Sequence, residues 1–241
     1  EAVKNAFMNF RENAIKTGRY NQDTDDIITE QWSRIIVHLP YAFQGKRMFP
    51  DVFMLDRKDT DTGAAIIDQI GENPSDDETK MAGLSDSEQE KIKNGYRRLI
   101  SKTEEYQKFT ADKIEKTQKA SGLVGNQYTA SIFLALMSTL EIDFTENNNL
   151  EGKKIGFCAY GSGAKSKVFQ GVVQKDWGAI AKRFNLFARL EDRTAINAST
   201  YEALHRGYQL ESVVKPAGEF VLKSVGGSDV LEGHRKYTWA D

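Results

Sequence analysis

The chain has 241 residues, 39% of them hydrophobic and 28% charged, and its formal net charge is −2. This balance predicts a folded protein and lacks the basic excess that nucleic-acid binding usually needs. The single cysteine excludes an intrachain disulfide, and no apolar run reaches the roughly 18 residues of a membrane span. We therefore expect a cytoplasmic protein whose partners include no nucleic acid and no membrane.

The first part of the chain predicts a helix, a strand and a second helix. Apolar residues at helical spacing indicate an amphipathic helix over 2–18. The segment "SRIIVHLP" (33–40) is typical of a short buried strand that stops at its proline. A helix with basic residues near its start is expected over 41–55.

Residues 56–119 form a charged segment, which we interpret as a partly helical insertion. Its first half is rich in Asp, Gly, Ser and Thr, as loops are. Ser85 and Glu88 then form a capping box, which predicts one long charged helix reaching about residue 119. A solvated helix is favoured over a cover for a ligand entrance.

The remaining sequence alternates between helices and strands. It predicts a helix over 127–141, a strand, glycine-rich turn and strand over 152–173, short helices over 176–184 and 199–208, and two strands over 219–239. This alternation predicts an α/β or α+β class with a central sheet. No linker divides the chain, so a single domain over 1–241 is expected.

His38 is the first candidate site residue. It closes the buried strand, where a side chain is rigid yet can face a cleft; a satisfied core histidine is the alternative. Lys46 and Arg47 follow, either on a solvated face or as phosphate contacts beside that cleft. His205 and His234 lie in polar surroundings, and the three histidines are too scattered to predict a metal site.

Two further segments carry candidate residues. In "GNQYT", Asn126 either caps the following helix or donates its amide to a bound carbonyl near the helix N-terminus. In "AYGSGAKS", Gly161 and Gly163 allow the backbone to present N–H groups to an oxyanion, or simply form a tight turn. The pattern differs from the nucleophile elbow and from nucleotide-binding glycine loops. Cys158 is interpreted as a small buried hydrophobe.

Taken in order, five segments resemble the C-terminal half of hydroxymethylglutaryl-CoA synthase. They are "HLPY" (38–41), "GNQYTAS" (125–131), "GKKIGFCAYGSG" (152–163), "LEDR" (190–193) and "EGHRKYTW" (232–239). The resemblance spans nearly the whole chain, and the second and third segments are its most specific parts. It implies the thiolase-like fold, a mixed central sheet flanked by helices.

The resemblance also implies a chemistry. In that family acetyl-CoA acylates a cysteine, a glutamate removes a proton from the acetyl methyl group, and the carbanion attacks acetoacetyl-CoA. The resemblance assigns catalytic roles to His38 and Asn126, which contact the acetoacetyl group, and to Ser162, whose backbone N–H lies near the thioester oxygen. Substrate binding falls on Lys46, Arg47, Tyr160, Gly161 and Gly163. The substrates are coenzyme A thioesters, and no cofactor or metal is expected.

Two departures from the family pattern limit the resemblance. A lysine that family members often carry five residues after the histidine is Phe43 here. The nucleophilic cysteine and the general-base glutamate belong to an N-terminal half that this sequence lacks, and Cys158 does not match the nucleophile's motif. We therefore expect a fragment, or one subunit of a split enzyme, that is inactive alone; the family implies a homodimer.

Three functions stay open at this point. The first is the synthase of the mevalonate pathway, which condenses acetyl-CoA with acetoacetyl-CoA. The second is a polyketide β-branching synthase, which takes its acetyl group from a carrier protein. The third is a non-catalytic module that binds acyl-CoA or forms dimers.

Overall fold

The computed structural model describes residues 2–21, 27–161, 163, 165–209, 211–227 and 232–241. Contacts divide the chain into two compact units, Glu1–Leu190 and Glu191–Asp241. The sequence shows no linker at this boundary, and a single domain over 1–241 stays a prediction.

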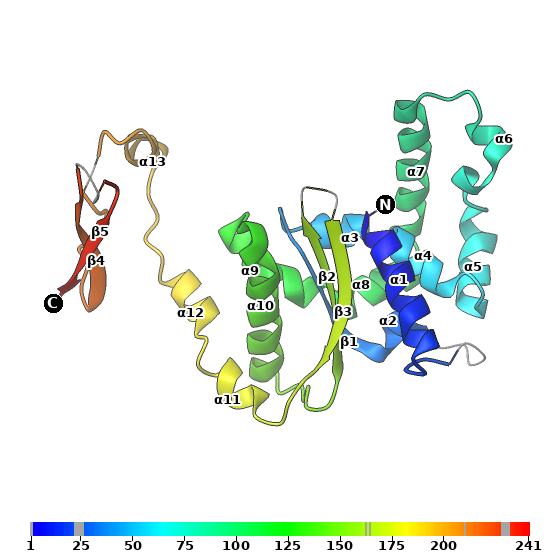
Figure 1. Cartoon of the computed structure of the whole chain (residues 1–241), viewed down its shortest axis with the longest axis horizontal. Helices are drawn as coiled ribbons and strands as arrows, with labels where there is room; N and C mark the ends of the chain where they lie inside the picture. Colours follow the sequence, from blue (N-terminus) through cyan, green and yellow to red (C-terminus); the bar gives the residue numbers. More distant parts are fainter. Residues whose placement is uncertain (1, 22–26, 162, 164, 210, 228–231) are drawn as a thin grey trace. The chain divides into compact units, whose positions relative to one another are not determined.

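A mixed three-stranded sheet forms the centre of the first unit (Figure 1). Its strands are β1 (Trp32–Val37), β2 (Lys154–Gly161) and β3 (Lys165–Val172), in the order β1-β2-β3. Strand β1 pairs with β2 in parallel, and β2 pairs with β3 as an antiparallel hairpin. Every position of β1 except Ser33 is buried, as its apolar sequence predicted.

Helices cover both faces of this sheet. Helix α1 (Ala2–Lys16) packs on β2 and β3, while α9 (Glu115–Val124) and α10 (Ser131–Thr145) lie on the opposite side, where they contact β1 (Figure 1). The prediction of a mixed sheet flanked by helices is therefore confirmed.

The charged segment 56–119 is more helical than its sequence suggested. Short helices occupy the stretch that was expected to be loop, and the single long helix expected after Ser85 is divided into three. Its capping box is present, but the helix ends at Ile100, because the Thr103 side chain accepts a hydrogen bond from the Tyr106 N–H and starts a new helix. The other helices of this unit are α2 (Ile28–Gln31), α3 (Gln44–Met48), α4 (Pro50–Arg57), α5 (Asp61–Ile70), η1 (Pro74–Asp76), α6 (Glu78–Met81), α7 (Asp86–Ile100), α8 (Glu104–Lys113), η2 (Tyr128–Ala130), α11 (Trp177–Ala181) and α12 (Leu186–Glu191).

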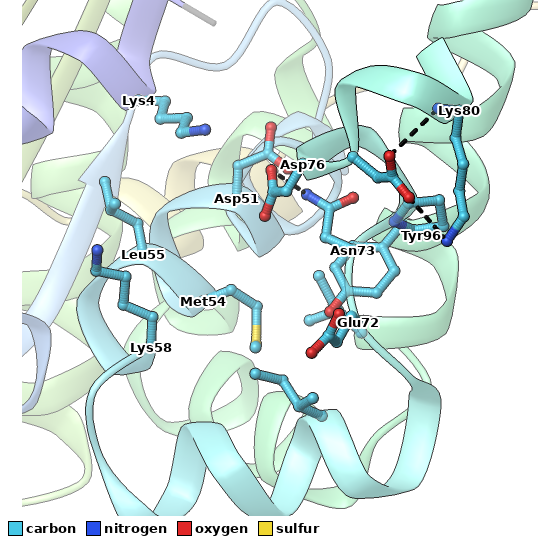
Figure 2. Close-up of a pocket in the computed structure, with 14 residues that line it drawn as sticks. Lys4, Asp51, Met54, Leu55, Lys58, Glu72, Asn73, Asp76, Lys80 and Tyr96 are labelled. Atoms are coloured by element: carbon cyan, nitrogen blue, oxygen red, sulfur yellow. Dashed lines mark hydrogen bonds and ion pairs between the residues drawn. The ribbon is translucent and has the colours of Figure 1, made fainter.

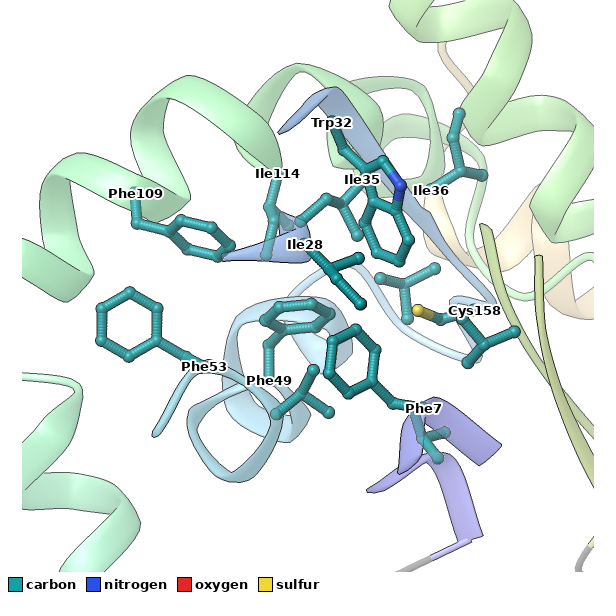
Figure 3. Packing of buried hydrophobic residues seen from close by; sticks show 14 of the residues in the cluster. Phe7, Ile28, Trp32, Ile35, Ile36, Phe49, Phe53, Phe109, Ile114 and Cys158 are labelled. Atoms are coloured by element: carbon teal, nitrogen blue, oxygen red, sulfur yellow. The ribbon is translucent and has the colours of Figure 1, made fainter. Parts of the chain in front are cut away.

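Trp32 is one of the largest fully buried side chains in the core of the first unit (Figure 3). The edge of its fully buried indole meets the Phe7 ring, with 6.0 Å between ring centroids, and its Nε1–H donates to Gln170 Oε1 at 2.9 Å. Gly156 lies directly beneath the indole, where a Cβ atom would stand 2.1 Å from the ring. The Trp32 indole can pack against β2 here only because position 156 has no side chain.

A buried ion pair joins β1 to α10. Arg34 donates to both carboxylate oxygens of Asp143, at 2.8 and 2.7 Å, and Lys116 adds a third bond at 2.8 Å. Burial alone raises the pKa of Asp143, but the hydrogen bonds from Arg34 and Lys116 outweigh it and leave that pKa below its usual value. The pair thus holds the helix against the strand that carries His38.

Beyond the end of α12, the described residues of the second unit form one helix and one hairpin. They are α13 (Ala198–His205), capped by the Asn197 side chain, and the antiparallel strands β4 (Glu219–Val225) and β5 (Arg235–Ala240). On the hairpin, Phe220 and Trp239 face each other with 5.0 Å between ring centroids. The sequence predicted both strands and this helix.

Candidate active site

His38 follows β1 directly, and two elements hold it. Its backbone N–H donates to the Cys158 carbonyl at 3.0 Å, which continues the β1–β2 pairing by one residue. Its ring nitrogen Nδ1 lies 2.8 Å from Ser131 Oγ at the start of α10. The ring is half-buried, and burial lowers the pKa of His38, so the imidazole is neutral near pH 7.

Ser131 is the site residue that the sequence analysis missed. It is the first residue of α10, it is fully buried, and its Oγ also accepts a hydrogen bond from the Leu39 N–H at 3.1 Å. Through this hydroxyl, the segment 125–131 contacts the segment 38–41. One sequence feature could have indicated it. Ser131 is the last residue of "GNQYTAS", and a small polar residue there precedes an apolar helical segment.

Gly125 and Asn126 form the turn between α9 and α10. Gly125 ends α9 at φ +87, and its N–H donates to the Ser121 carbonyl at 2.9 Å. Asn126 Oδ1 accepts from the Tyr128 N–H at 2.8 Å, whereas the N-cap residue of α10 is Ala130. Tyr128 is the first residue of η2, which runs directly into α10. Asn126 therefore satisfies a free N–H at the start of this helical segment, although it is not the N-cap residue of either helix. Its carboxamide is exposed, and its Nδ2 has no partner among the described residues.

The β2–β3 turn lies beside His38. The Tyr160 ring is tilted by 45° to the imidazole, with 6.4 Å between centroids, and Gly161 pairs with Lys165 as the turn begins. Gly163 is exposed within the turn. Ser162 lies outside the described residues, so its role stays a prediction.

Cys158 lies in β2 and is inaccessible to solvent. Burial raises the pKa of this thiol to about 12. A thiol in this state is a poor nucleophile, because attack on a thioester needs the thiolate. This agrees with the interpretation of Cys158 as a small buried hydrophobe.

Lys46 and Arg47 lie on α3. Lys46 forms an ion pair with Glu115 and lines a cavity of about 420 Å³ together with Phe43, whereas Arg47 is exposed. Among the described residues, no hydrogen bond or ion pair joins either cation, or Asn126, to His38. The structure thus shows His38 in contact with Ser131 and Tyr160, whereas Lys46 pairs with Glu115.

A second cavity, of about 590 Å³, lies among α4, α5, η1, α6 and α7 (Figure 2). Much of its polar lining has structural partners. Asp51 pairs with Arg97 at 2.8 Å, and Asp77 accepts from backbone N–H groups at the start of α6. None of the predicted site residues lines this cavity.

The described part of the chain offers no cluster of three or more His, Cys, Asp or Glu side chains arranged to hold a metal ion. A search of the same residues finds no helix with the length and apolar character that crossing a membrane requires.

Solved structures define the class of the fold. A structure of MvaS in complex with 3-hydroxy-3-methylglutaryl coenzyme A superposes with a TM-score of 0.70 at 20% identity, over 99% of this chain and 49% of that one. The HMG synthase of the curacin biosynthetic pathway superposes with a TM-score of 0.57 at 22% identity, over 98% of this chain and 50% of that one. The fold is therefore thiolase-like, as the motifs implied.

The family follows from the sequence itself. The family model described as "Hydroxymethylglutaryl-coenzyme A synthase C terminal" matches residues 1–215, and the chain belongs to this family. The hydroxymethylglutaryl-CoA synthase of Haloferax volcanii is 29% identical over 175 residues, which cover 70% of this chain and 38% of the relative. The hydroxymethylglutaryl-CoA synthase of Schizosaccharomyces pombe is 41% identical over 81 residues, which cover 32% of this chain and 17% of the relative. The matches thus span half or less of each of these related proteins.

Proposed function

We propose that this chain is the acetoacetyl-CoA-binding half of a hydroxymethylglutaryl-CoA synthase. The complete enzyme would condense acetyl-CoA with acetoacetyl-CoA to hydroxymethylglutaryl-CoA in the mevalonate pathway. The observation that supports this most is the contact between His38 and Ser131, because it joins two of the motif segments around one neutral, rigidly held imidazole.

Each site residue receives a role suited to its chemistry. His38 polarises the ketone of the acetoacetyl group, and the free Asn126 amide donates to the same acyl portion. Neutral donors that are fixed in advance stabilise the negative charge that develops only in the transition state. Ser162 supplies a backbone N–H toward the thioester oxygen. Tyr160, Gly161 and Gly163 line the acyl site, and Lys46 and Arg47 serve the phosphates of coenzyme A.

The nucleophile must come from elsewhere. Cys158 is the only cysteine of the chain, and its buried, protonated thiol cannot reach a thioester. We therefore assign the nucleophilic cysteine and the general-base glutamate to a missing N-terminal half, and a homodimer to the complete enzyme. The isolated chain should bind acetoacetyl-CoA but give no product with both thioesters; turnover by the chain alone would contradict this assignment.

The role of His38 is tested in the complete synthase. His38→Ala should lower the condensation rate by roughly a hundredfold or more, while acetyl-CoA should still acetylate the nucleophilic cysteine. His205→Ala on α13 is the matched control, because His205 is exposed and should leave both steps unchanged. Unchanged affinity and turnover with acetoacetyl-CoA in His38→Ala would overturn the role.

The acetyl donor separates this proposal from its alternative. Condensation that proceeds with acetyl-CoA supports the mevalonate-pathway enzyme. Condensation that requires an acetyl group on a carrier protein would assign the chain to a polyketide β-branching synthase instead. If the complete protein binds acyl-CoA and catalyses neither reaction, the chain is a binding module.

A further inference from the structure

The Ser131 hydroxyl occupies a position where its hydrogen bonds can be counted. Its Oγ lies 3.1 Å from the Leu39 nitrogen and 2.8 Å from His38 Nδ1, and Ser131 has no accessible surface. No other polar group among the described residues contacts this oxygen. Bulk water does not reach this oxygen, so these two contacts are the ones that satisfy the hydroxyl.

The direction of one bond fixes the direction of the other. The Leu39 N–H can only donate, so Oγ accepts there. The hydroxyl proton then needs an acceptor, and the lone pair of His38 Nδ1 is the one within reach. If Nδ1 carried the ring proton instead, the buried hydroxyl proton would have no acceptor, a cost that disfavours that tautomer by roughly tenfold or more.

We propose that Ser131 is a positioning residue that holds the neutral His38 ring with its proton on Nε2. Given the proposed function, Nε2–H is then the donor that faces the acyl oxygen of the substrate, and Ser131 acts only through the ring. Tyr160 is a titratable residue that also packs against the imidazole, but its contact is between the rings, with 6.4 Å between centroids. The hydrogen bond at Nδ1 is made by Ser131. Burial lowers the pKa of His38, which agrees with a ring that stays neutral.

The tautomer can be observed directly. Long-range proton–nitrogen NMR of the ¹⁵N-histidine-labelled chain distinguishes Nε2–H from Nδ1–H, and a His38→Gln variant assigns the signals against the exposed His205 and His234. The wild-type chain should show His38 as the neutral Nε2–H form at pH 7.5. Ser131→Ala should reduce its excess over the Nδ1–H form by roughly tenfold or more, and Ser131→Thr, which keeps the hydroxyl, should restore it.

Ser138→Ala is the matched control for a purely structural effect. Ser138 lies on the same helix, is equally buried and donates to the Lys116 carbonyl at 2.8 Å, away from His38. Its removal should leave the His38 tautomer unchanged. An Nδ1–H ring in the wild-type chain, or an unaltered tautomer in folded Ser131→Ala, would overturn the proposal.

The same measurement keeps this inference separate from the proposed function. The wild-type spectrum reports the tautomer without any catalysis. If His38 is the Nε2–H tautomer but His38→Ala leaves acetoacetyl-CoA use unchanged in the complete synthase, the positioning of the ring stands and the assigned reaction falls. If the tautomer is wrong and His38→Ala is inactive, the reaction stands and the role of Ser131 falls.

Discussion

Replacing Gly156 by alanine should destabilise the first unit strongly, because the new methyl group would overlap the Trp32 indole. The Cβ would lie 2.1, 2.3 and 2.5 Å from three ring carbons. Ordinary contact between carbon atoms begins near about 3.5 Å, so the indole or the strand must move by more than about 1 Å. Such overpacking costs about 1–3 kcal/mol. If the indole also loses its bond to Gln170, about 1 kcal/mol is added.

We therefore expect Gly156→Ala to lower the free energy of unfolding by about 2–4 kcal/mol. Urea denaturation followed by far-ultraviolet circular dichroism measures this as a lower midpoint. Gly171→Ala on the neighbouring strand is the control, because its Cβ would lie 3.6 Å from the Phe157 ring, an ordinary contact. That variant should stay within about 1 kcal/mol of wild type. Equal midpoints for the two variants would refute the reasoning.

Two other predictions concern stability. Asp143→Asn should cost about 3 kcal/mol by leaving Arg34 buried without its carboxylate. Because the pKa of Asp143 is lowered on folding, the stability that this pair contributes is complete above about pH 4 and is lost as the pH falls through the folded-state value. Acid titrations of stability should therefore be shallower in the variant, and parallel curves would contradict the pairing. Gly63→Ala should destabilise by more than about 2 kcal/mol, since its Cβ would lie 1.9 Å from the Arg57 carbonyl oxygen. Gly95→Ala, in open space on α7, should instead stabilise by about 0.5–1 kcal/mol, and a similar loss in both would count against the steric cause.

Features with a local cause could be predicted from the sequence. The strands have continuous apolar or alternating patterns, and Ser85 with Glu88 forms a capping box that needs no distant partner. The long charged helix was mispredicted because no strong stop signal appears in its sequence, yet it is interrupted at residues 101–103, where Thr103 caps a new helix, and again at Ile114. The role of Asn126 stayed open for a related reason, since a sequence cannot distinguish a side chain that supports a turn from one that caps a helix.

Features that depend on tertiary packing could not be predicted. Ser131 and His38 are 93 residues apart, and nothing near the serine indicates what it contacts. Gly156 is one of 19 glycines, and only the position of Trp32 explains why a side chain is excluded there. The motifs therefore predicted candidate segments, whereas the structure shows which atoms meet.

Two contacts, here called ties, join α10 to β1 and to Leu39, which lies two residues beyond the end of β1. One is the Arg34–Asp143 ion pair, and the other is the hydrogen bond from the Leu39 N–H to Ser131. Arg34 and Leu39 are separated by five residues of chain, or about 17 Å when extended. Ser131 and Asp143 are separated by twelve residues of helix, or about 18 Å. Because these lengths match, the helix can lie antiparallel to the strand with both ends fixed. His38, next to the second tie, is thereby held against α10.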